Sequence, residues 1–329
     1  KMNIGLAISG GDGSGINNFI HSFCSYLDDD NNFYFFQNGL NGLLENNVEI
    51  KSKYYALDYS LSDLPCISSG RTSRMLDDND RKIILDNLKK NNIDIFVLAG
   101  GDGSLHFLNT LKDEHIKFYG IPLTIDNDIE GSDYSIGHPS AMEVIKDEVK
   151  RIRNSGRALN NRVFILEVLG GYCGYLALNS ALISNADFVL VPELPIDLDK
   201  VANSIKEKLK KQNSFVIICS EGCKPSYKPG EQVIAPEFAR ILEEKTGIRV
   251  RQGILGYGQR NGIPNTEELY KSNKLAYYLK CAIDEGIHNV FVGLTNDGKA
   301  SYIKLGDVKT RKIDKEHENV KMAMKRNII

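Results

Sequence analysis

Residues 3–17 read NIGLAISGGDGSGIN, an apolar run that leads into a cluster of glycines and then into an amphipathic stretch. A short apolar run predicts a buried strand, and the glycines and amphipathic stretch after it predict a loop and a helix. The same order recurs along the chain, so we expect an α/β fold with mostly parallel sheets. In such sheets ligands bind beyond the carboxyl ends of the strands, where the glycine clusters fall.

The other elements expected from periodicity follow the same alternation. The buried parallel strands are expected at Asn3–Ile8, Ile93–Leu98, Lys117–Ile121, Arg162–Val168, Phe188–Val191, Phe215–Cys219 and Asn289–Leu294. The helices are expected at Ile16–Leu27, Asp80–Asn91, Ala141–Arg153, Tyr175–Ser184, Leu198–Lys211, Pro236–Thr246 and Glu267–Glu285. The lysine-rich end, Lys309–Lys325, is expected to be a solvated helix or tail.

Length and charge exclude several classes of protein. The chain has 329 residues, which predicts about two domains, and its 41 Lys and Arg against 43 Asp and Glu give a formal net charge of −2. This balance gives no sequence-wide reason to bind nucleic acid or an anionic membrane. No apolar run approaches the roughly 20 residues needed to span a bilayer, and the first residues lack a signal-peptide layout. We therefore expect a soluble, cytoplasmic protein.

The six cysteines are scattered along the chain. Cys219 and Cys223 are close in sequence, but no second Cys/His pair with ligand spacing accompanies them, so a zinc site is not expected. Reduced thiols in a cytoplasmic protein are the expected state.

Two glycine-rich motifs follow expected strands. In Ser9–Asn17 the glycines would bring backbone N–H groups close to phosphate oxygens at a helix N-terminus, although no Gly-Lys-Ser/Thr follows and a tight structural turn is an equal alternative. In Gly100–Ser104, Asp102 is placed to hold Mg²⁺ through water. A helix N-cap remains the alternative for this aspartate.

The third motif, Thr124-Ile125-Asp126-Asn127-Asp128, follows the strand at Lys117–Ile121. On an extended segment both carboxylates would point the same way, so one could accept a proton from a substrate hydroxyl while the other helps to hold a metal. An Asx turn is the competing interpretation. Four arginines are candidate phosphate ligands: Arg74, Arg162, Arg251 and Arg260. Arg162 is expected to open a strand and Arg251 to end one.

Taken in order, these motifs resemble those of the ATP-dependent 6-phosphofructokinase family. The resemblance runs from about Met2 to Gly293 and also includes Gly131–Gly137, Gly170-Gly171-Tyr172-Cys173-Gly174 and Leu255–Arg260. It implies ATP- and Mg²⁺-dependent phosphorylation of fructose 6-phosphate at the 1-hydroxyl, a step of glycolysis that yields fructose 1,6-bisphosphate and ADP. A dinucleotide-binding oxidoreductase would need a glycine fingerprint and an acidic ribose ligand that the chain lacks.

The resemblance also implies roles for individual residues. Asp126 matches the general base, Thr124 lies at the transferring phosphate, and Asp102 and Asp128 match the acids associated with Mg²⁺. The positions that match the ATP side are Gly11, Arg74, Asp102, Gly103 and Ser104. The positions that match the sugar-phosphate side are Leu169, Gly170, Glu221, Tyr257 and Arg260, with Arg162 and Arg251 reaching from a neighbouring subunit.

The implied architecture is two similar three-layer α/β domains that enclose the active site, in a homotetramer or dimer. Residues 1–138 with 259–308 would form the larger, ATP- and Mg²⁺-binding domain. Residues 139–258 with 309–329 would form the smaller, sugar-phosphate-binding domain. Fructose 6-phosphate and ATP are the expected partners, and neither nucleic acid nor membrane is expected.

Several positions depart from the family pattern. Gly103 fits ATP, because pyrophosphate-dependent relatives carry an aspartate there, but Leu123 matches neither type. Phe107 stands where a small glycine is usual near the nucleotide, Tyr257 replaces a histidine, and Gly171 replaces a cationic residue. The alternatives are a kinase of this family that uses pyrophosphate or another acceptor such as sedoheptulose 7-phosphate, and a non-catalytic sugar-phosphate-binding subunit.

Overall fold

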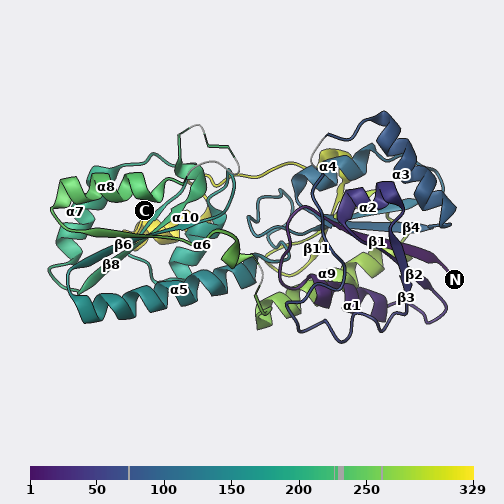
Figure 1. Ribbon diagram of the computed structural model, residues 1–329, viewed down its shortest axis with the longest axis horizontal. Helices are drawn as coiled ribbons and strands as arrows, with labels where there is room; N and C mark the ends of the chain where they lie inside the picture. Colours follow the sequence, from purple (N-terminus) through teal and green to yellow (C-terminus); the bar gives the residue numbers. More distant parts are fainter. Residues whose placement is uncertain (73–74, 226, 229–232, 261) are drawn as a thin grey trace. The chain divides into compact units, whose positions relative to one another are not determined.

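The computed structural model describes residues 1–72, 75–225, 227–228, 233–260 and 262–329, which form two compact units (Figure 1). Unit 1 comprises Lys1–Ile125, Ile129–Ser140 and Arg260–Thr310, and unit 2 comprises Asp126–Asp128, Ala141–Gln259 and Arg311–Ile329. The Asp126–Asp128 segment therefore belongs with unit 2, whereas the division expected from the sequence has it with residues 1–138.

Within its described residues, unit 1 contains a seven-stranded sheet in the order β11-β10-β5-β4-β1-β2-β3. The strands are β1 (Asn3–Ser9), β2 (Asn32–Phe36), β3 (Val48–Lys51), β4 (Ile95–Gly100), β5 (Lys117–Pro122), β10 (Val290–Leu294) and β11 (Ala300–Lys304). Neighbours are parallel except at the two edges, where β3 and β11 run antiparallel to β2 and β10.

Helices cover both faces of this sheet. Helices α1 (Ile16–Ser25) and α9 (Thr266–Asp284) contribute to the core on one face, where alternate β1 side chains such as Leu6 and Ile8 point. Helices α2 (Gly39–Glu45), α3 (Asp78–Lys90) and α4 (Asp102–Thr110) pack on the other face (Figure 1). Because parallel strands are buried on both faces, β1 and β4 are apolar almost throughout.

In unit 2 the described strands form a four-stranded parallel sheet in the order β7-β8-β6-β9. They are β6 (Arg162–Val168), β7 (Phe188–Leu190), β8 (Ser214–Ser220) and β9 (Val250–Ile254). Helices α7 (Leu198–Lys208) and α8 (Ala235–Thr246) pack on one face, and α5 (His138–Leu159) and α6 (Tyr175–Ser184) lie on the other (Figure 1). Helix α10 (Glu318–Lys325) packs against α6, and the 3-10 helices are η1 (Glu221–Cys223), η2 (Gly256–Gln259) and, in unit 1, η3 (Leu305–Asp307).

The strand register decides where the loops of each unit meet. In unit 1 the last residues of three neighbouring strands are paired, Ser9 with Gly100 and Gly100 with Pro122. In unit 2 Val168 at the end of β6 pairs with Ser220 at the end of β8. The loops that carry the sequence motifs therefore leave each sheet at a common carboxyl edge.

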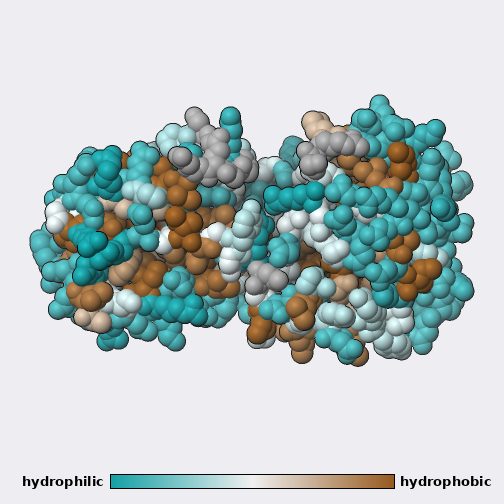
Figure 2. Space-filling view, viewed as in Figure 1, coloured by the Kyte–Doolittle hydropathy of each residue, from teal (hydrophilic) through white to brown (hydrophobic). Residues whose placement is uncertain are grey.

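Local sequence signals explain several helix boundaries. Helix α3 begins with a capping box in which Asp77 accepts a hydrogen bond from the Asp80 amide and Asp80 accepts one in return. The Asp197 and Asn265 side chains cap α7 and α9 in the same way as Asp77. The surface over α3 and α5 is largely hydrophilic (Figure 2), as expected for amphipathic helices on a sheet. No helix of the described ranges is long and apolar enough to cross a membrane.

The expected fold class, α/β with mostly parallel sheets, is confirmed. Each strand expected from its apolar run is present, but β2, β3, β9 and β11 were not expected. Three of these are edge strands, and β9 (VRQGI) is largely exposed, so its sequence lacks the apolar run of a buried strand. Helices α2 and α4 were also missed because glycines near their N-termini predict turns.

The expectation of a solvated helix or tail at Lys309–Lys325 is confirmed in part: the segment ends in helix α10, but it is not solvated on all sides. Val320 and Ala323 of α10 are fully buried, and α10 packs against α6. Ile313, in the segment that precedes α10, is also buried. The spacing of these apolar residues among many lysines hid the buried face of the segment.

Glu268 in α9 is a fully buried carboxylate that holds several loops of unit 1 together. It accepts hydrogen bonds from the Tyr134 hydroxyl (2.6 Å), the Gly137 amide (2.9 Å) and the amide and hydroxyl of Ser140 (3.1 and 2.8 Å). Its side chain also fills the space beside Gly15, where φ is +94° and an added Cβ would lie 2.5 Å from the Glu268 Cγ. Burial raises the pKa of Glu268 from 4.5 to about 7, although these hydrogen bonds oppose the shift.

We predict that Glu268 makes unit 1 less stable as the pH rises. Between its ordinary pKa of 4.5 and about 7 the folded protein keeps a proton that the unfolded chain releases, so this contribution to stability is lost over that interval. Glu268→Gln should flatten the pH dependence of the thermal midpoint measured between about pH 5 and about pH 8. Glu267→Gln, on the adjacent and more exposed residue, is the control and should leave the dependence unchanged. Equal dependence in wild type and Glu268→Gln would contradict the prediction.

Candidate active site

The motif loops of unit 1 lie side by side at the carboxyl edge of its sheet. The Ser104 hydroxyl donates to the Ser9 carbonyl (3.3 Å), which joins the loop after β4 to the loop after β1. The Leu123 amide donates to the Gly100 carbonyl (3.0 Å) and thereby fixes Thr124 beside the same edge. Of the predicted site residues, the structure thus brings Gly11, Asp102, Gly103, Ser104 and Thr124 to one edge of unit 1.

Backbone at this edge is accessible because glycines leave space there. An added Cβ at Gly101 or Gly103 would have no atom within 4 Å, so the first turn of α4 is open. An open helix N-terminus favours an anion, because its N–H groups and dipole both point outward. At Gly11, by contrast, an added Cβ would collide with the Arg260 guanidinium, so Arg260 already lies against the first glycine loop. This arrangement can bind phosphate groups.

Asp102 begins α4 and keeps a partly exposed carboxylate. Its Oδ1 accepts from the Gly103 amide (2.8 Å) and its Oδ2 from the Thr310 hydroxyl (3.0 Å). A hard cation such as Mg²⁺ prefers carboxylate oxygens and usually keeps water and phosphate ligands as well. Among the residues that the structure describes, no cluster of three or more metal-ligating side chains occurs. Asp102 therefore fits a Mg²⁺ held mainly by phosphates and water, with one protein carboxylate.

Asp126 lies in a turn with Ile125, and the segment Asp126–Asp128 (the Asp126–Asp128 turn) is not extended. Of the two interpretations of this motif, an extended segment and an Asx turn, the extended segment is wrong. Asn127 has a positive φ of 52° and is buried. A left-handed residue between the two aspartates breaks the alternation that would have turned both carboxylates to one side. Asparagine tolerates this conformation better than most residues, which the sequence alone does not reveal.

In unit 2 Asp126 lies beside the loop that follows β6. An added Cβ at Gly171 would lie 3.2 Å from Asp126 Oδ2, so the glycine leaves room for this carboxylate. The Gly171 amide donates to Glu221 Oε1 (2.9 Å), which connects the loop after β6 with the start of η1 after β8. The Leu169 amide donates to the buried Gln259 Oε1 (3.2 Å). The structure thus brings Asp126, Leu169, Gly170 and Glu221 together.

Two residues of this region were missed from the sequence. Gln259 fixes both Leu169 and the Gly256 carbonyl (2.8 Å), yet a glutamine within a glycine-rich stretch has no distinctive spacing.

Tyr227 packs its ring edge-to-face on Tyr172, with 5.2 Å between ring centroids. Burial raises the pKa of the Tyr227 hydroxyl, and the neighbouring carboxylates of Glu221 and Asp126 raise it further. Tyr227 is therefore a neutral hydroxyl beside two acids.

The remaining predicted residues lie elsewhere. Arg162 begins β6 and Arg251 is the second residue of β9, so both lie at the amino edge, opposite Glu221. The expectation that Arg251 ends a strand is wrong, because β9 begins at Val250. Tyr257 in η2 is 79% exposed. Arg74 lies outside the described residues.

The profile of the family described as phosphofructokinase matches residues 3–282. The chain belongs to the phosphofructokinase family.

Named relatives fall within this family. The chain is 36% identical over 307 residues to the ATP-dependent 6-phosphofructokinase of Sulfurimonas denitrificans, covering 92% of this chain and 91% of that protein. It is 37% identical over 268 residues to the enzyme of the same name from Wolinella succinogenes, covering 80% of this chain and 81% of that protein. It is 30% identical over 315 residues to the pyrophosphate–fructose 6-phosphate 1-phosphotransferase of Thermoproteus tenax, with 93% of each covered.

Solved structures agree on the fold. The pyrophosphate-dependent phosphofructokinase of Nitrosospira multiformis superposes with a TM-score of 0.86 at 19% identity, over 99% of this chain and 91% of that one. The phosphofructokinase of Saccharomyces cerevisiae gives 0.82 at 23% identity, over 93% of this chain and 43% of that one. At these identities the likeness shows the phosphofructokinase fold alone.

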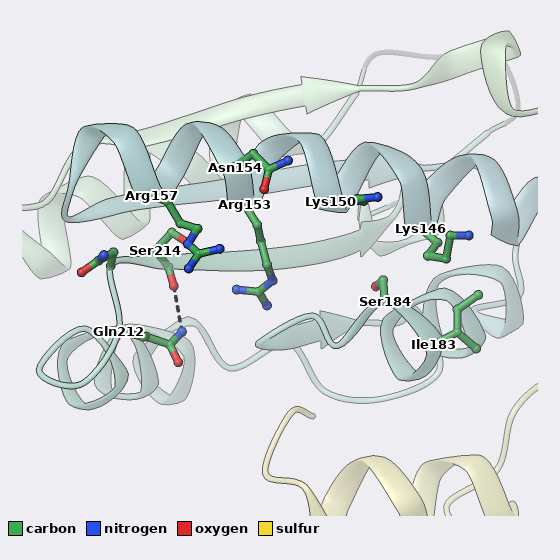
Figure 3. A pocket seen from close by; sticks show the side chains of 10 residues that line it. Lys146, Lys150, Arg153, Asn154, Arg157, Ile183, Ser184, Gln212 and Ser214 are labelled. Atoms are coloured by element: carbon green, nitrogen blue, oxygen red, sulfur yellow. Dashed lines mark hydrogen bonds between the residues drawn. The ribbon is translucent and has the colours of Figure 1, made fainter.

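A basic cavity of about 500 Å³ in unit 2 lies apart from these loops (Figure 3). Cationic side chains on one face of α5 line it, together with residues just before and at the start of β8: Lys146, Lys150, Arg153, Arg157, Gln212 and Ser214. Ser214 begins β8, whereas the motif residue Glu221 follows the end of the strand, so the cavity lies at the amino edge. The described lining contains none of the predicted site residues.

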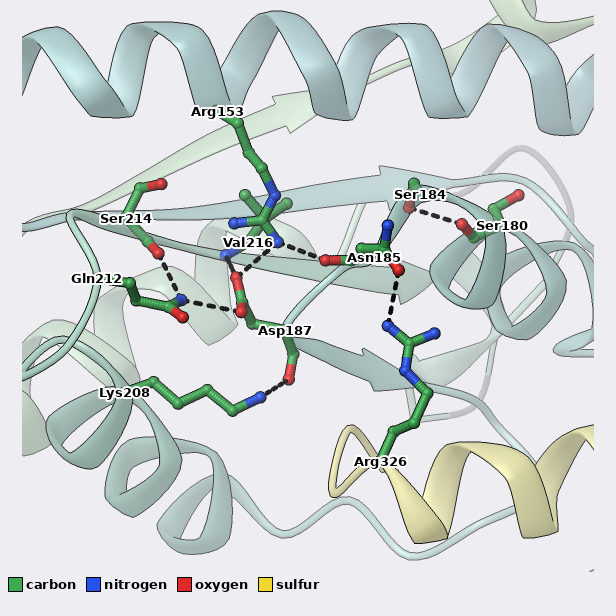
Figure 4. Close-up of polar contacts among 10 residues, drawn as sticks. All are labelled: Arg153, Ser180, Ser184, Asn185, Asp187, Lys208, Gln212, Ser214, Val216 and Arg326. Atoms are coloured by element: carbon green, nitrogen blue, oxygen red, sulfur yellow. Dashed lines mark hydrogen bonds and ion pairs between the residues drawn. The ribbon is translucent and has the colours of Figure 1, made fainter.

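Asp187 binds two of the side chains that line this cavity, Arg153 and Gln212 (Figure 4). Its carboxylate accepts from Arg153 (2.9 Å), Gln212 (2.9 Å) and the Val216 amide (2.8 Å). The Lys208 ammonium donates to the Asp187 carbonyl (2.9 Å), and partial burial lowers the pKa of Lys208 although Asp187 opposes the shift. A buried acid with this many donors holds α5, α7 and β8 together.

We predict that Gly171→Ala impairs any reaction that uses Asp126. Alanine at the positive φ of 61° costs about 1–2 kcal/mol of stability, and its Cβ presses on Asp126 Oδ2. Gly247→Ala is the matched control, because Gly247 has a φ of 71° and open space around its Cβ. Denaturant unfolding should show similar losses of stability for both variants, whereas phosphoryl-transfer activity should fall only in Gly171→Ala. Parallel losses of activity in the two variants would contradict the role of this contact.

Proposed function

We propose that this chain is an ATP-dependent 6-phosphofructokinase, which transfers the γ-phosphoryl group of ATP to the 1-hydroxyl of fructose 6-phosphate. The products would be fructose 1,6-bisphosphate and ADP, as in glycolysis. The observation that carries the proposal is that Asp126 lies beside Gly171 of the loop after β6. The amide of this same glycine donates to Glu221. The names of the relatives from Sulfurimonas denitrificans and Wolinella succinogenes support it.

Asp126 is the proposed general base. The attacking 1-hydroxyl must lose its proton as its oxygen bonds to phosphorus, and an ionised carboxylate within hydrogen-bond reach can accept that proton. With no side chain at Gly171, nothing from this residue presses on Asp126 Oδ2 from the side of the loop after β6. Tyr227 would keep a neutral hydroxyl next to this base, since burial and acids raise its pKa. The proton of the substrate's 1-hydroxyl then resides on Asp126 until solvent removes it.

The nucleotide is proposed to bind at the glycine loops of unit 1. Phosphoryl transfer depends on in-line positioning and on neutralising charge spread over the phosphate oxygens. Backbone N–H groups at Gly11, Gly103 and Ser104 can supply part of that neutralisation, and Thr124 would contact the transferring group. Mg²⁺, when bound, would neutralise phosphate charge. Asp102 would hold it through water and Asp128 would assist.

The sugar phosphate is proposed to bind mainly through unit 2. Backbone at Leu169 and Gly170 would face the sugar, Glu221 would accept its hydroxyls, and Tyr257 and Arg260 would contact its phosphate. Arg162 and Arg251 are proposed to reach the 6-phosphate bound by a neighbouring subunit, in a homo-oligomer, either a tetramer or a dimer. Their place at the amino edge, away from Glu221, supports a role outside their own unit's loops. A cytoplasmic location is part of this proposal.

A second candidate is the same reaction with pyrophosphate as donor. The relative from Thermoproteus tenax, named for pyrophosphate, favours it. The open space at Gly103 favours ATP instead, because an aspartate there would crowd a nucleotide and repel its phosphates. We therefore prefer ATP. The assay below also separates fructose 6-phosphate from another sugar-phosphate acceptor, and a kinase from a non-catalytic binding subunit.

The test of the proposed function is an activity matrix on purified protein, with ATP or pyrophosphate as donor and fructose 6-phosphate or sedoheptulose 7-phosphate as acceptor. We expect the highest kcat/KM with ATP and fructose 6-phosphate.

Asp126→Asn should lower kcat by roughly 10²–10⁴-fold, because the base is lost without a change of shape. Glu130→Gln, an exposed acid-to-amide change near the motif, is the control and should keep full activity. Absence of turnover with ATP in the wild type would refute the proposal.

We predict that donor choice depends on the absence of a side chain at Gly103. Gly103→Asp should raise the KM for ATP by about tenfold or more, because a carboxylate beside the phosphates costs at least about 1.4 kcal/mol. Gly103→Ala adds bulk without charge, and it should raise stability by about 0.5–1 kcal/mol in the first turn of α4. Steady-state kinetics with ATP and with pyrophosphate measure the effect. An unchanged KM for ATP in Gly103→Asp would place the nucleotide elsewhere.

A further inference from the structure

Arg311 binds the backbone of the Asp126–Asp128 turn from a distant part of the chain. Its amide donates to the Asp128 carbonyl (2.7 Å) and its Nε donates to the Asn127 carbonyl (2.9 Å). Arg311 and the turn both belong to unit 2, and they are more than 180 residues apart in sequence. Arg311 also lies beyond residues 3–282, the part that matches the family profile.

The guanidinium of Arg311 is held in a fixed plane. Its Cζ lies over the ring of Tyr175, 4.3 Å from the centroid. Tyr175 is almost fully buried at the first position of α6, and its ring also meets the ring of His317, edge-to-face at 5.0 Å. Arginine stacks on an aromatic face through its flat, delocalised charge. The stacking therefore orients the Nε–H that reaches Asn127.

The segment that carries Arg311 is anchored as well. The Ile313 amide donates to Glu193 Oε1 (3.2 Å), and Glu193 also accepts from the Gly174 amide (2.9 and 3.1 Å). Gly174 immediately precedes α6 and closes the loop that contains Gly171. The same carboxylate thus joins the Arg311 segment to the loop on which Asp126 rests. In unit 1 the neighbouring Thr310 binds Asp102 (3.0 Å).

The turn requires such external support. Asn127 has a positive φ of 52°, a conformation that costs energy for any residue except glycine, and the residue is buried. If Arg311 were removed, the Asn127 carbonyl would lose a charge-assisted hydrogen bond, and a buried acceptor left without one costs about 1–3 kcal/mol. The turn would then relax toward another conformation. Such a change would rotate the flanking Asp126 carboxylate.

We propose that Arg311 is a positioning residue for the reaction: through Asn127 and Asp128 it sets the orientation of Asp126. This inference rests on the proposed function, in which Asp126 is the base. A base displaced by about 1 Å can cost on the order of 10²-fold in rate, although the residue that displaces it never touches the substrate. Arg311 thereby acts on the chemical step through the backbone and not by binding phosphate.

The test compares Arg311→Ala with Arg326→Ala. Arg326 is the matched control, because it also donates to a backbone carbonyl and a side chain in unit 2, at Leu182 (3.0 Å) and Asn185 (3.0 Å), the latter drawn in Figure 4. We expect Arg311→Ala to lower kcat by about 10–100-fold while the KM for ATP stays within about twofold of wild type. Arg326→Ala should keep kcat despite a similar loss of thermal stability.

One further variant and a rescue experiment separate geometry from charge. Arg311→Lys keeps the charge but has no flat group to stack on Tyr175, so its kcat should stay close to that of Arg311→Ala. Millimolar guanidinium should restore part of the kcat of Arg311→Ala and none in Asp126→Asn. Wild-type kcat in Arg311→Lys, or equal losses in Arg311→Ala and Arg326→Ala, would overturn the proposal.

Hydrogen exchange provides a readout that does not depend on activity. Amides of residues 126–128 should exchange faster in Arg311→Ala than in wild type and in Arg326→Ala, since the turn loses its support. Unchanged exchange in Arg311→Ala would overturn the inference even if activity fell. Lack of turnover in the wild type, by contrast, would refute the proposed function and leave the exchange result to decide whether Arg311 holds the turn.

Discussion

The in-register pairing of parallel strands is the constraint on which the other features of both units depend. Because Ser9, Gly100 and Pro122 are paired neighbours at the ends of their strands, the three motif loops of unit 1 leave the sheet at one edge. A slip of one residue would turn every buried side chain of a strand to the opposite face, so the apolar core enforces this register. The pairing of Val168 with Ser220 has the same consequence in unit 2. The loops that carry the chemistry are thus placed by strand burial.

This dependence explains why much of the fold was predictable from the sequence. Buried parallel strands are uniformly apolar, and runs such as Phe215–Cys219 have few other interpretations. Glycines and acids directly after such runs must lie at a carboxyl edge, so Asp102 and Glu221 could be assigned to a candidate site before any coordinates. The edge strands β3 and β11 were missed for the complementary reason. They are partly exposed, and their sequences carry no strong apolar pattern.

The rest of the candidate site depends on contacts between residues far apart in sequence. Asp126 could be identified from its motif, but the left-handed Asn127 beside it is stabilised by Arg311, which no local pattern connects to the motif. Gln259 and Tyr227 likewise act through partners that lie many residues away. Each has an ordinary local sequence. Residue type and spacing therefore predict which groups do chemistry, whereas the groups that orient them become visible only in three dimensions.

Carboxylates supply a large share of that orientation. Glu221 accepts from the loop after β6, Glu193 from the start of α6, Glu268 from the segment before α5, and Glu167 from the first amides of α8 at 2.9 and 2.8 Å. A loop that must stay open to substrate cannot bury much apolar surface, so it gains rigidity from charge-assisted hydrogen bonds to its own amides. Burial of such carboxylates has a cost in free energy, and it raises the pKa of Glu167 and of Glu268. For Glu167 and Glu268, the burial that lets the carboxylate hold its loop rigidly therefore also brings its protonation closer to the pH of the medium.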